Sequence, residues 1–242
     1  MINSRICEIL GIKYPVFQGG MAWIADARLA AAVSNAGGLG LISSILGGPE
    51  AVRTEIRLAR TLTNRPFGVN IMLAAPDAPE LARVVVEEGV GIVTTGAGSP
   101  APYMKMWADA GVKVIPVIAS VAYALKMEDL GAVAVVAEAR RICGTLPVIA
   151  AGGIFDGRSA AAAFLMGASA VQVGTRFLVA KECRVHPVYK DRLIKAGDIS
   201  TMVTGKSLGD AVRALKTPFS RQFAKMEADP SVSADQIRAF GT

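Results

Sequence analysis

Short, almost wholly apolar segments alternate with helical patterns along most of the chain. Apolar runs of this kind are typical of parallel strands that are buried on both faces. Eight strands are predicted: Pro15–Gln18, Leu39–Ser43, Phe67–Leu73, Ile92–Gly96, Lys113–Ala119, Ala132–Glu138, Pro147–Ala151 and Ala170–Thr175. The predicted helices are Ala27–Asn35, Pro49–Leu62, Asp77–Glu88, Pro102–Ala110, Val121–Leu130 and Ser159–Met166. This alternation predicts an α/β fold, a parallel (β/α)8 or TIM barrel.

Glycines mark the ends of the predicted helices. Residues 37, 89, 111, 131 and 167 are glycines that follow the last apolar turn, as is usual at helix C-termini. No repeat beyond the βα unit and no low-complexity linker interrupts the pattern. We therefore expect one domain, with residues 1–185 as the barrel and residues 186–242 as a polar, helical extension packed on it.

One connection is too short for the pattern. Between Glu138 and Pro147 lie only eight residues, ARRICGTL, whereas a parallel crossover with its helix needs about a dozen or more. Either the barrel is locally irregular, or residues are missing after Glu138. The second explanation is favoured, because RRICGT resembles the end of a helix that enters strand seven. The barrel is thus expected to lack the loop after its sixth strand.

The segment 147–177 carries the strongest functional signal. Two successive strands end in bare glycines, Gly152-Gly153 and Gly174-Thr175. Glycine lets a phosphate approach the backbone N–H groups closely, and barrels often bind phosphate after their last two strands. The pairing predicts a phosphorylated ligand or cofactor at this end of the barrel.

Other strand ends carry weaker signals. Gly19-Gly20, after strand one, allow either close approach of a flat ligand or a tight turn. Asn70 is a polar residue in an apolar strand, and its amide either satisfies the barrel interior or contacts a ligand. Thr94-Thr95 are expected to line the mouth at strand four. Glu138 ends strand six, as a hydrogen-bond acceptor for a ligand or as a loop acid.

Catalytic side chains are scarce. The only histidine, His186, precedes a proline beyond strand eight, and a structural role is favoured for it. No Ser/His/Asp set, Cys/His pair or metal-ligand cluster can be assembled from the sequence. A phosphate site with few acid–base groups suggests that a cofactor carries the chemistry.

Composition and charge limit the remaining classes. The chain is 52% hydrophobic and 19% charged, yet it contains no apolar run long enough to span a membrane and no secretory leader is expected. Three scattered cysteines, Cys7, Cys143 and Cys183, are interpreted as reduced thiols of a cytoplasmic protein. Between Arg176 and Lys225 stand eleven basic and four acidic residues, either a docking surface for an acidic partner or solvated helix faces. Nucleic acid is disfavoured, because no aromatic residues interleave with these charges.

Several motifs together resemble one enzyme family. FQGGMAWIAD, AVSNAGGLG, RPFGVNIML, VTTGAG, PVIAAGGI and AVQVGTRF are similar, in this order, to segments of the flavin-dependent enoyl-acyl-carrier-protein reductases of the FabK type. That family lies within a wider group that includes the nitronate monooxygenases. The resemblance implies non-covalent FMN, reduction by NADH or NADPH, an enoyl thioester on acyl carrier protein as substrate, and a homodimer. A monovalent cation is a further cofactor that it allows.

The resemblance also assigns site residues. It implies flavin contacts and a phosphate cradle at Gly20, Met21, Ala22, Asn70, Glu138, Gly152, Gly153, Gly174 and Thr175. The family has a Gly-Gly-His loop directly after the strand-six glutamate, whereas here Glu138-Ala139 leads straight into Arg140, so the catalytic residue stays unknown. Two alternatives remain open: a nitronate monooxygenase that uses FMN and oxygen, and a non-catalytic flavin- or phosphate-binding barrel.

Overall fold

The computed structural model describes residues 4–137, 145–209 and 211–241. The chain divides into two compact units, a barrel unit, Met1–Arg184, and a C-terminal unit, Val185–Thr242. Each is described by itself below. The packing of the C-terminal segment on the barrel stays a prediction.

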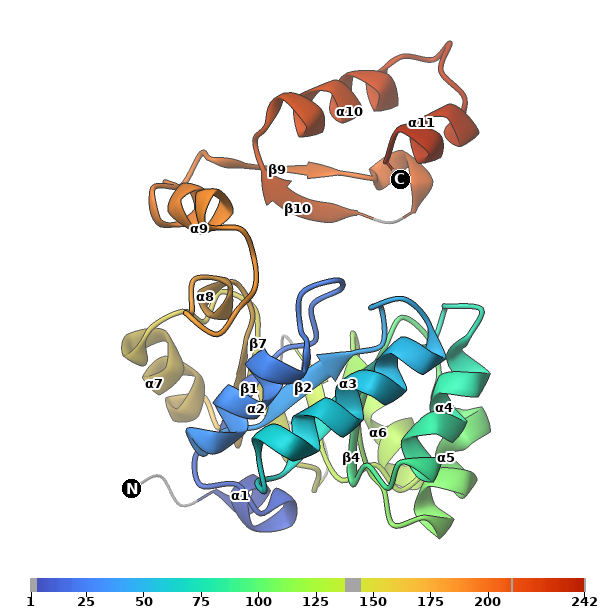
Figure 1. Ribbon diagram of the computed structural model, residues 1–242, viewed down its shortest axis with the longest axis vertical. Helices are drawn as coiled ribbons and strands as arrows, with labels where there is room; N and C mark the ends of the chain where they lie inside the picture. Colours follow the sequence, from blue (N-terminus) through green and yellow to red (C-terminus); the bar gives the residue numbers. More distant parts are fainter. Residues whose placement is uncertain (1–3, 138–144, 210, 242) are drawn as a thin grey trace. The chain divides into compact units, whose positions relative to one another are not determined.

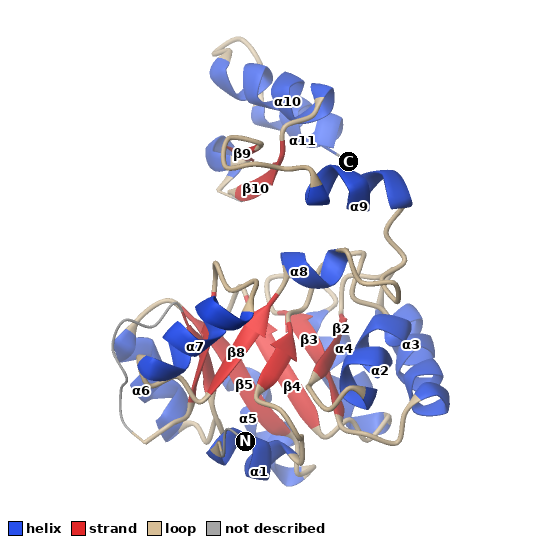
Figure 2. Cartoon of the chain, turned by 90° about the vertical axis from the view of Figure 1, so that its left-hand side faces the viewer, coloured by secondary structure: helices blue, strands red, loops and turns tan. Residues whose placement is uncertain are grey.

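The barrel unit is built around a parallel sheet of eight strands (Figures 1 and 2). The strands are β1 Val16–Gln18, β2 Gly40–Ser43, β3 Phe67–Met72, β4 Ile92–Gly96, β5 Lys113–Ile118, β6 Val135–Ala137, β7 Val148–Ala151 and β8 Ala170–Val173. Neighbours in sequence pair in parallel, and β1 pairs with β8. A single parallel bridge between Phe17 and Leu39 joins β1 to β2 and closes the ring. The predicted TIM barrel is confirmed.

Helices surround this sheet. They are α1 Arg5–Leu10, α2 Ala27–Asn35, α3 Pro49–Leu62, α4 Ala78–Glu87, α5 Ala101–Asp109, α6 Val121–Asp129, α7 Gly157–Leu165 and α8 Thr175–Leu178. The five glycines expected after helices have positive φ angles. After α4, for example, Gly89 N–H donates to Val86 O and Val90 N–H to Val85 O, both at 2.9 Å, which is the Schellman arrangement.

Two apolar layers hold the barrel together. Inside the ring, Phe17, Leu41, Ile115 and Ile149 pack in one buried cluster with Ile6 of α1. Alternate residues of the same strands point outward, where those of β2 to β5 form a larger cluster with α3, α4 and α5. Helix α1 lies at the end of the barrel where the strands begin (Figure 1). The opposite end, where the strands finish, is therefore the open mouth.

The alternation of side chains corrects one expectation at strand four. Thr94 Oγ1 donates to Asn70 Oδ1 at 2.9 Å, whereas Thr95 points to the other face of β4 and is 1% exposed. Within the described parts of the chain, Thr95 Oγ1 has no hydrogen-bond partner. Thr94 thus supports the mouth, and Thr95 belongs to the barrel wall.

A close backbone contact joins α2 to β2. A Cβ atom added at Gly40 would lie 1.9 Å from the carbonyl oxygen of Ala30, in the middle of α2. Only glycine permits the helix and the strand to approach this closely. Gly40 therefore lets α2 pack directly against the start of β2.

The C-terminal unit is not purely helical, which the sequence analysis missed. It contains the expected helices α9 Pro187–Ile194, α10 Pro218–Ala228 and α11 Ala234–Gly241, together with an antiparallel hairpin of β9 Thr201–Thr204 and β10 Val212–Leu215. Gly205 and Gly209, at φ of 81° and 82°, allow the chain to turn between the two strands. The rings of Phe219, Phe223 and Phe240 pack together between α10 and α11.

No helix in the described residues is long and apolar enough to cross a membrane. In the same part of the chain, no three His, Cys, Asp or Glu side chains are grouped as metal ligands would be.

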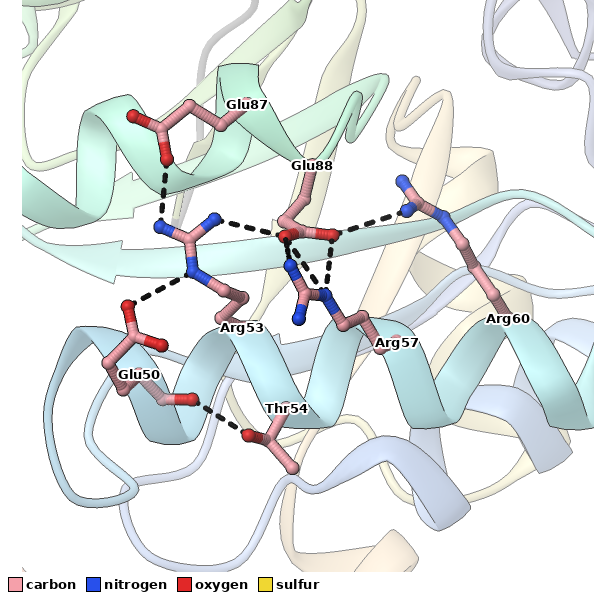
Figure 3. Close-up of polar contacts among 7 residues, drawn as sticks. All are labelled: Glu50, Arg53, Thr54, Arg57, Arg60, Glu87 and Glu88. Carbon is pink, nitrogen blue, oxygen red and sulfur yellow. Dashed lines mark hydrogen bonds and ion pairs between the residues drawn. The ribbon is translucent and has the colours of Figure 1, made fainter.

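An ion-pair network joins α3 to the end of α4 (Figure 3). The Glu88 carboxylate accepts hydrogen bonds from Arg53 at 3.0 Å, Arg57 at 2.7 Å and Arg60 at 3.5 Å. The Glu88 side chain is 8% exposed, so its charge depends on these partners. Hydrogen bonds from Arg57 and Arg53 hold the pKa of Glu88 below its usual range.

Replacing this carboxylate should destabilise the barrel in a pH-dependent way. Folding lowers the pKa of Glu88. The ionised carboxylate therefore contributes its full share to the free energy of unfolding above the unfolded-state pKa of about 4.3, and this share is lost as pH falls through the folded-state pKa. At neutral pH, Glu88→Gln should lower the free energy of unfolding by about 1–2 kcal/mol, between the values for exposed and buried pairs. Urea unfolding at several pH values measures this difference.

Glu50→Gln is the matched control. Glu50 pairs with Arg53 alone and is 79% exposed, so its loss should cost less than about 0.5 kcal/mol. If Glu88→Gln lowers the free energy of unfolding by the same amount at pH 7 and at pH 3, the charge of Glu88 does not have the stabilising role described.

Candidate functional site

The candidate site lies at the mouth of the barrel. Figure 2 shows the strand arrows pointing toward the end where α8 lies. The loops after β1, β7 and β8 meet there, because β1 is the neighbour of β8 and β8 is the neighbour of β7. Active sites of (β/α)8 barrels are built from the loops at this end.

The loops after β7 and β8 leave backbone exposed. Gly152 and Gly153 both have left-handed φ angles, 93° and 68°, and both are exposed. A Cβ added at Gly153 or Gly174 would meet no atom within 4 Å, so open space lies beside each. Helix α8 begins at Thr175 with no side-chain cap, and its first N–H groups have no intrahelical acceptor. The exposed glycine backbone and the N–H groups at the start of α8 are therefore available to bind an anion.

Helix α7 is capped differently. The Asp156 carboxylate accepts from Ser159 N–H at 2.8 Å and from the Ser159 hydroxyl at 2.7 Å. Asp156 N–H in turn donates to the Ser159 hydroxyl at 3.1 Å, which completes a capping box. These hydrogen bonds from Ser159 hold the pKa of Asp156 below its usual range. A carboxylate therefore already occupies the start of α7. An anion at the mouth would use the backbone of the two glycine loops and the start of α8 instead.

Asn70 presents a hydrogen-bond donor at the mouth. Its Oδ1 accepts from the Thr94 hydroxyl, which fixes the orientation of the amide. Within the described residues, Nδ2 has no acceptor. The side chain lies against Gly20, where an added Cβ would stand 2.4 Å from Asn70 Cγ. Gly20 thus leaves room for the amide, whose NH2 group is free for a ligand.

A second carboxamide, which the sequence analysis missed, stands beside it. Gln172 of β8 packs under Gly19, where an added Cβ would be 3.3 Å from Cγ and from Nε2 of Gln172. Its side chain makes no hydrogen bond with any described residue. The alternation of side chains along β8 could have revealed this residue. Ala170 belongs to the interior cluster, and Gln172, two residues later, must face the interior as well.

Gln18 has a structural task at the same strand end. It is fully buried, and its Oε1 accepts from Leu41 N–H at 3.1 Å while its Nε2 donates to the carbonyl of Gly19. Because β1 and β2 share a single bridge, this amide supplies bonds that the ladder lacks there. Gln18 therefore fixes the backbone just before Gly19 and Gly20.

Met21 and Ala22 lie in a tight turn after the glycines. The Met21 carbonyl accepts from Ile24 N–H at 3.1 Å and from Ala25 N–H at 2.9 Å. Met21 is half-buried and Ala22 is exposed. The turn keeps both residues beside Gly20, and their contact with a flavin stays a prediction.

Glu138 and His186 are the remaining candidates from the sequence. Glu138 lies outside the described residues, and β6 ends just before it, at Ala137. His186 belongs to the C-terminal unit, where its Nδ1 accepts from Val188 N–H at 3.2 Å and caps α9. This contact supports the structural role expected for the histidine.

Comparison with known proteins identifies the family. The family model described as nitronate monooxygenase matches residues 3–87 and 136–237. The chain belongs to the nitronate monooxygenase family. Membership makes it an oxidoreductase of the flavin-dependent (β/α)8 class.

Similar proteins are named for different enzyme activities. The chain is 35% identical to a 5-hydroxy-7a-methyl-1-oxo-octahydro-1H-indene-4-carboxyl-CoA dehydrogenase of Mycobacterium tuberculosis, with 89% of this chain and 67% of the relative aligned. It is 26% identical to a probable nitronate monooxygenase of Staphylococcus aureus, with 94% and 82% aligned. The chain thus spans about two thirds of the dehydrogenase and more of the monooxygenase.

The second alignment is longer than the chain. It extends over 291 positions, more than the 242 residues of the chain. The relative therefore carries segments within the aligned region that this chain does not have.

Among solved structures, FabK from Thermotoga maritima superposes with a TM-score of 0.92 and is 44% identical, with 99% of this chain and 82% of that chain covered. A nitroalkane oxidase from Streptomyces ansochromogenes superposes with a TM-score of 0.80 at 24% identity, with 96% and 84% covered, which supports the fold alone.

The contact between Gly20 and Asn70 leads to a direct test. In Gly20→Ala, the new methyl group would overlap Asn70 and push its amide away from the mouth. Loss of one oriented donor is worth about 1.4 kcal/mol, so FMN should bind about tenfold more weakly. Fluorescence titration of the apoprotein with FMN measures this change.

Gly91→Ala is the matched control, because an added Cβ there meets nothing within 4 Å and Gly91 lies before β4, at the far end of the barrel. Its FMN affinity should equal that of the wild type. If Gly20→Ala binds FMN as tightly as the wild type, Asn70 does not contribute to FMN binding.

Proposed function

We propose that the protein is an FMN-dependent enoyl-acyl-carrier-protein reductase that uses NADH or NADPH. The observation that carries the proposal is the set of groups at the mouth: exposed glycine backbone follows β7 and β8, and beside it the end of β1 has two glycines packed against the side chains of Asn70 and Gln172. The 44% identity to FabK from Thermotoga maritima over 99% of this chain supports the choice of reaction.

The residues at the mouth fit FMN. Gly152, Gly153, Gly174 and Thr175 would hold the phosphate through backbone N–H groups. Gly20, Met21, Ala22, Asn70 and Glu138 would contact the rest of the cofactor. When bound, FMN supplies the capacity to accept and donate hydride.

The chain's own residues orient and confine the ligands. Asn70 donates through Nδ2, because Thr94 holds its oxygen. Gln18 keeps the two glycines fixed by bonding to the backbone of β2. The group that protonates the reduced product is not assigned, since the single histidine of the chain caps α9 in the C-terminal unit.

The partners are part of the same proposal. Acyl carrier protein would deliver the enoyl thioester, and the excess of basic residues between Arg176 and Lys225 would attract an acidic protein. We also propose a homodimer and leave open a monovalent cation.

A nitronate monooxygenase is the second candidate. The family model and the Staphylococcus aureus relative favour it by name. The strand-one segment QGGMAW disfavours it, because the Gln-Ala-Pro-Met form is common in that group. A non-catalytic flavin barrel, the third candidate, rests on the short connection after Glu138.

Anaerobic stopped-flow spectroscopy and a separate aerobic assay of oxygen uptake together distinguish these candidates. NADH or NADPH should bleach the FMN absorbance, and crotonyl thioester should then restore it, because the reductase needs no oxygen. Oxygen uptake with an alkyl nitronate, without bleaching by either nucleotide, would establish the monooxygenase instead. Absence of both reactions in FMN-loaded protein would leave the non-catalytic barrel.

A further inference from the structure

Trp23 combines two unfavourable features at the mouth of the barrel. Its backbone has a φ angle of 63°, in the left-handed region, and its side chain is 72% exposed. A bulky residue with positive φ is strained, and an exposed indole gains little from burial. Neither backbone preference nor packing within the described residues explains tryptophan at this position.

The strained conformation is held from several sides. Trp23 N–H donates to the carbonyl of Ile45, in the loop after β2, at 2.8 Å. The turn closed by the Met21 carbonyl encloses Trp23, and Asp26 caps α2 at the end of the loop, accepting from Leu29 N–H at 3.0 Å. Strain that the surroundings fix in this way clusters at ligand-binding positions.

The chemistry of this edge of the mouth indicates the ligand. The loop 19–25 reads GGMAWIA and the neighbouring loop 44–48 reads SILGG, so neither carries a charge. Across the ring, Val117 at the end of β5 is 41% exposed. The pyrophosphate of NADH or NADPH would need a free cation here, whereas Arg184 pairs with Asp26, at the end of the loop 19–25, at 3.7 Å. An acyl chain needs only apolar surface.

We infer that Trp23 contacts the acyl chain of the thioester substrate and sets the preference for chain length. This inference rests on the proposed function. The basic residues Arg158 and Arg176 lie in the first turns of α7 and α8, the helices that follow β7 and β8. The segments after β7 and β8 thus suit the charged parts of the ligands, and the loop after β1 suits the apolar chain.

Two variants separate a binding role from a structural role. Trp23→Ala removes the indole but keeps a side chain at positive φ, whereas Trp23→Gly removes both the indole and the strain. Both should raise KM for decenoyl thioester about tenfold and leave KM for NADH and turnover of crotonyl thioester unchanged. Trp23→Gly should melt at or above the wild-type temperature. Leu165→Ala, which alters an 89% exposed side chain on α7, should change nothing.

Three results would overturn the inference: an unchanged KM for decenoyl thioester in both variants, an equal rise in KM for NADH, or a clear drop in the melting temperature of Trp23→Gly. If wild-type protein reduces no enoyl thioester, the proposed function fails, and a binding measurement then decides the role of Trp23.

That measurement is intrinsic fluorescence of the FMN-free protein. The other tryptophan, Trp107, is fully buried and donates to the carbonyl of Ala82. Decanoyl-coenzyme A should therefore shift the emission of the exposed Trp23, and free coenzyme A should not. The shift should be absent from Trp23→Phe. An emission spectrum of the wild type that decanoyl-coenzyme A leaves unchanged contradicts the inference.

Discussion

The mouth of this barrel depends on the close approach of two glycines to two carboxamides. Gly20 lies so near Asn70 that a Cβ would overlap it, and Gly19 covers Gln172 in a similar way. These contacts join the end of β1 to β3 on one side and to β8 on the other. Since β1 and β2 share only one bridge, Gln18 must hold the strand end in place by bonding to β2. Any side chain at Gly20 would disturb the whole arrangement.

The mouth offers three chemical environments around these contacts. The loops after β7 and β8 offer exposed backbone and nearby cations, which suit a phosphate. The Nδ2 group of Asn70 and the side-chain amide of Gln172 make no hydrogen bond with the described residues and are available to a ligand. The loop after β1 offers apolar surface, with Trp23 held outward. These three environments match, in order, the phosphate of a cofactor, its planar ring system and the apolar chain of a substrate.

Much of the fold could be predicted from local patterns. Ala27–Asn35 and Pro49–Leu62 have the expected bounds, because Asp26 caps one helix and Pro49 begins the other. The hairpin of β9 and β10 was missed, since strands of four residues carry too little alternation to stand out from helical neighbours. Gln172 was missed because only strand register brings it under Gly19. The left-handed conformation of Trp23 arises from a bond to another loop, which no local pattern reveals. Glu138 lies outside the described residues, so its placement stays a prediction.

The central claim is that the glycine loops after β7 and β8 hold the phosphate of FMN. Isothermal titration of the apoprotein with FMN and with riboflavin tests it directly, because the two ligands differ only in the phosphate. Two charge-assisted hydrogen bonds contribute about 3 kcal/mol, so FMN should bind at least about a hundredfold more tightly. Equal affinity for the two ligands would contradict the account.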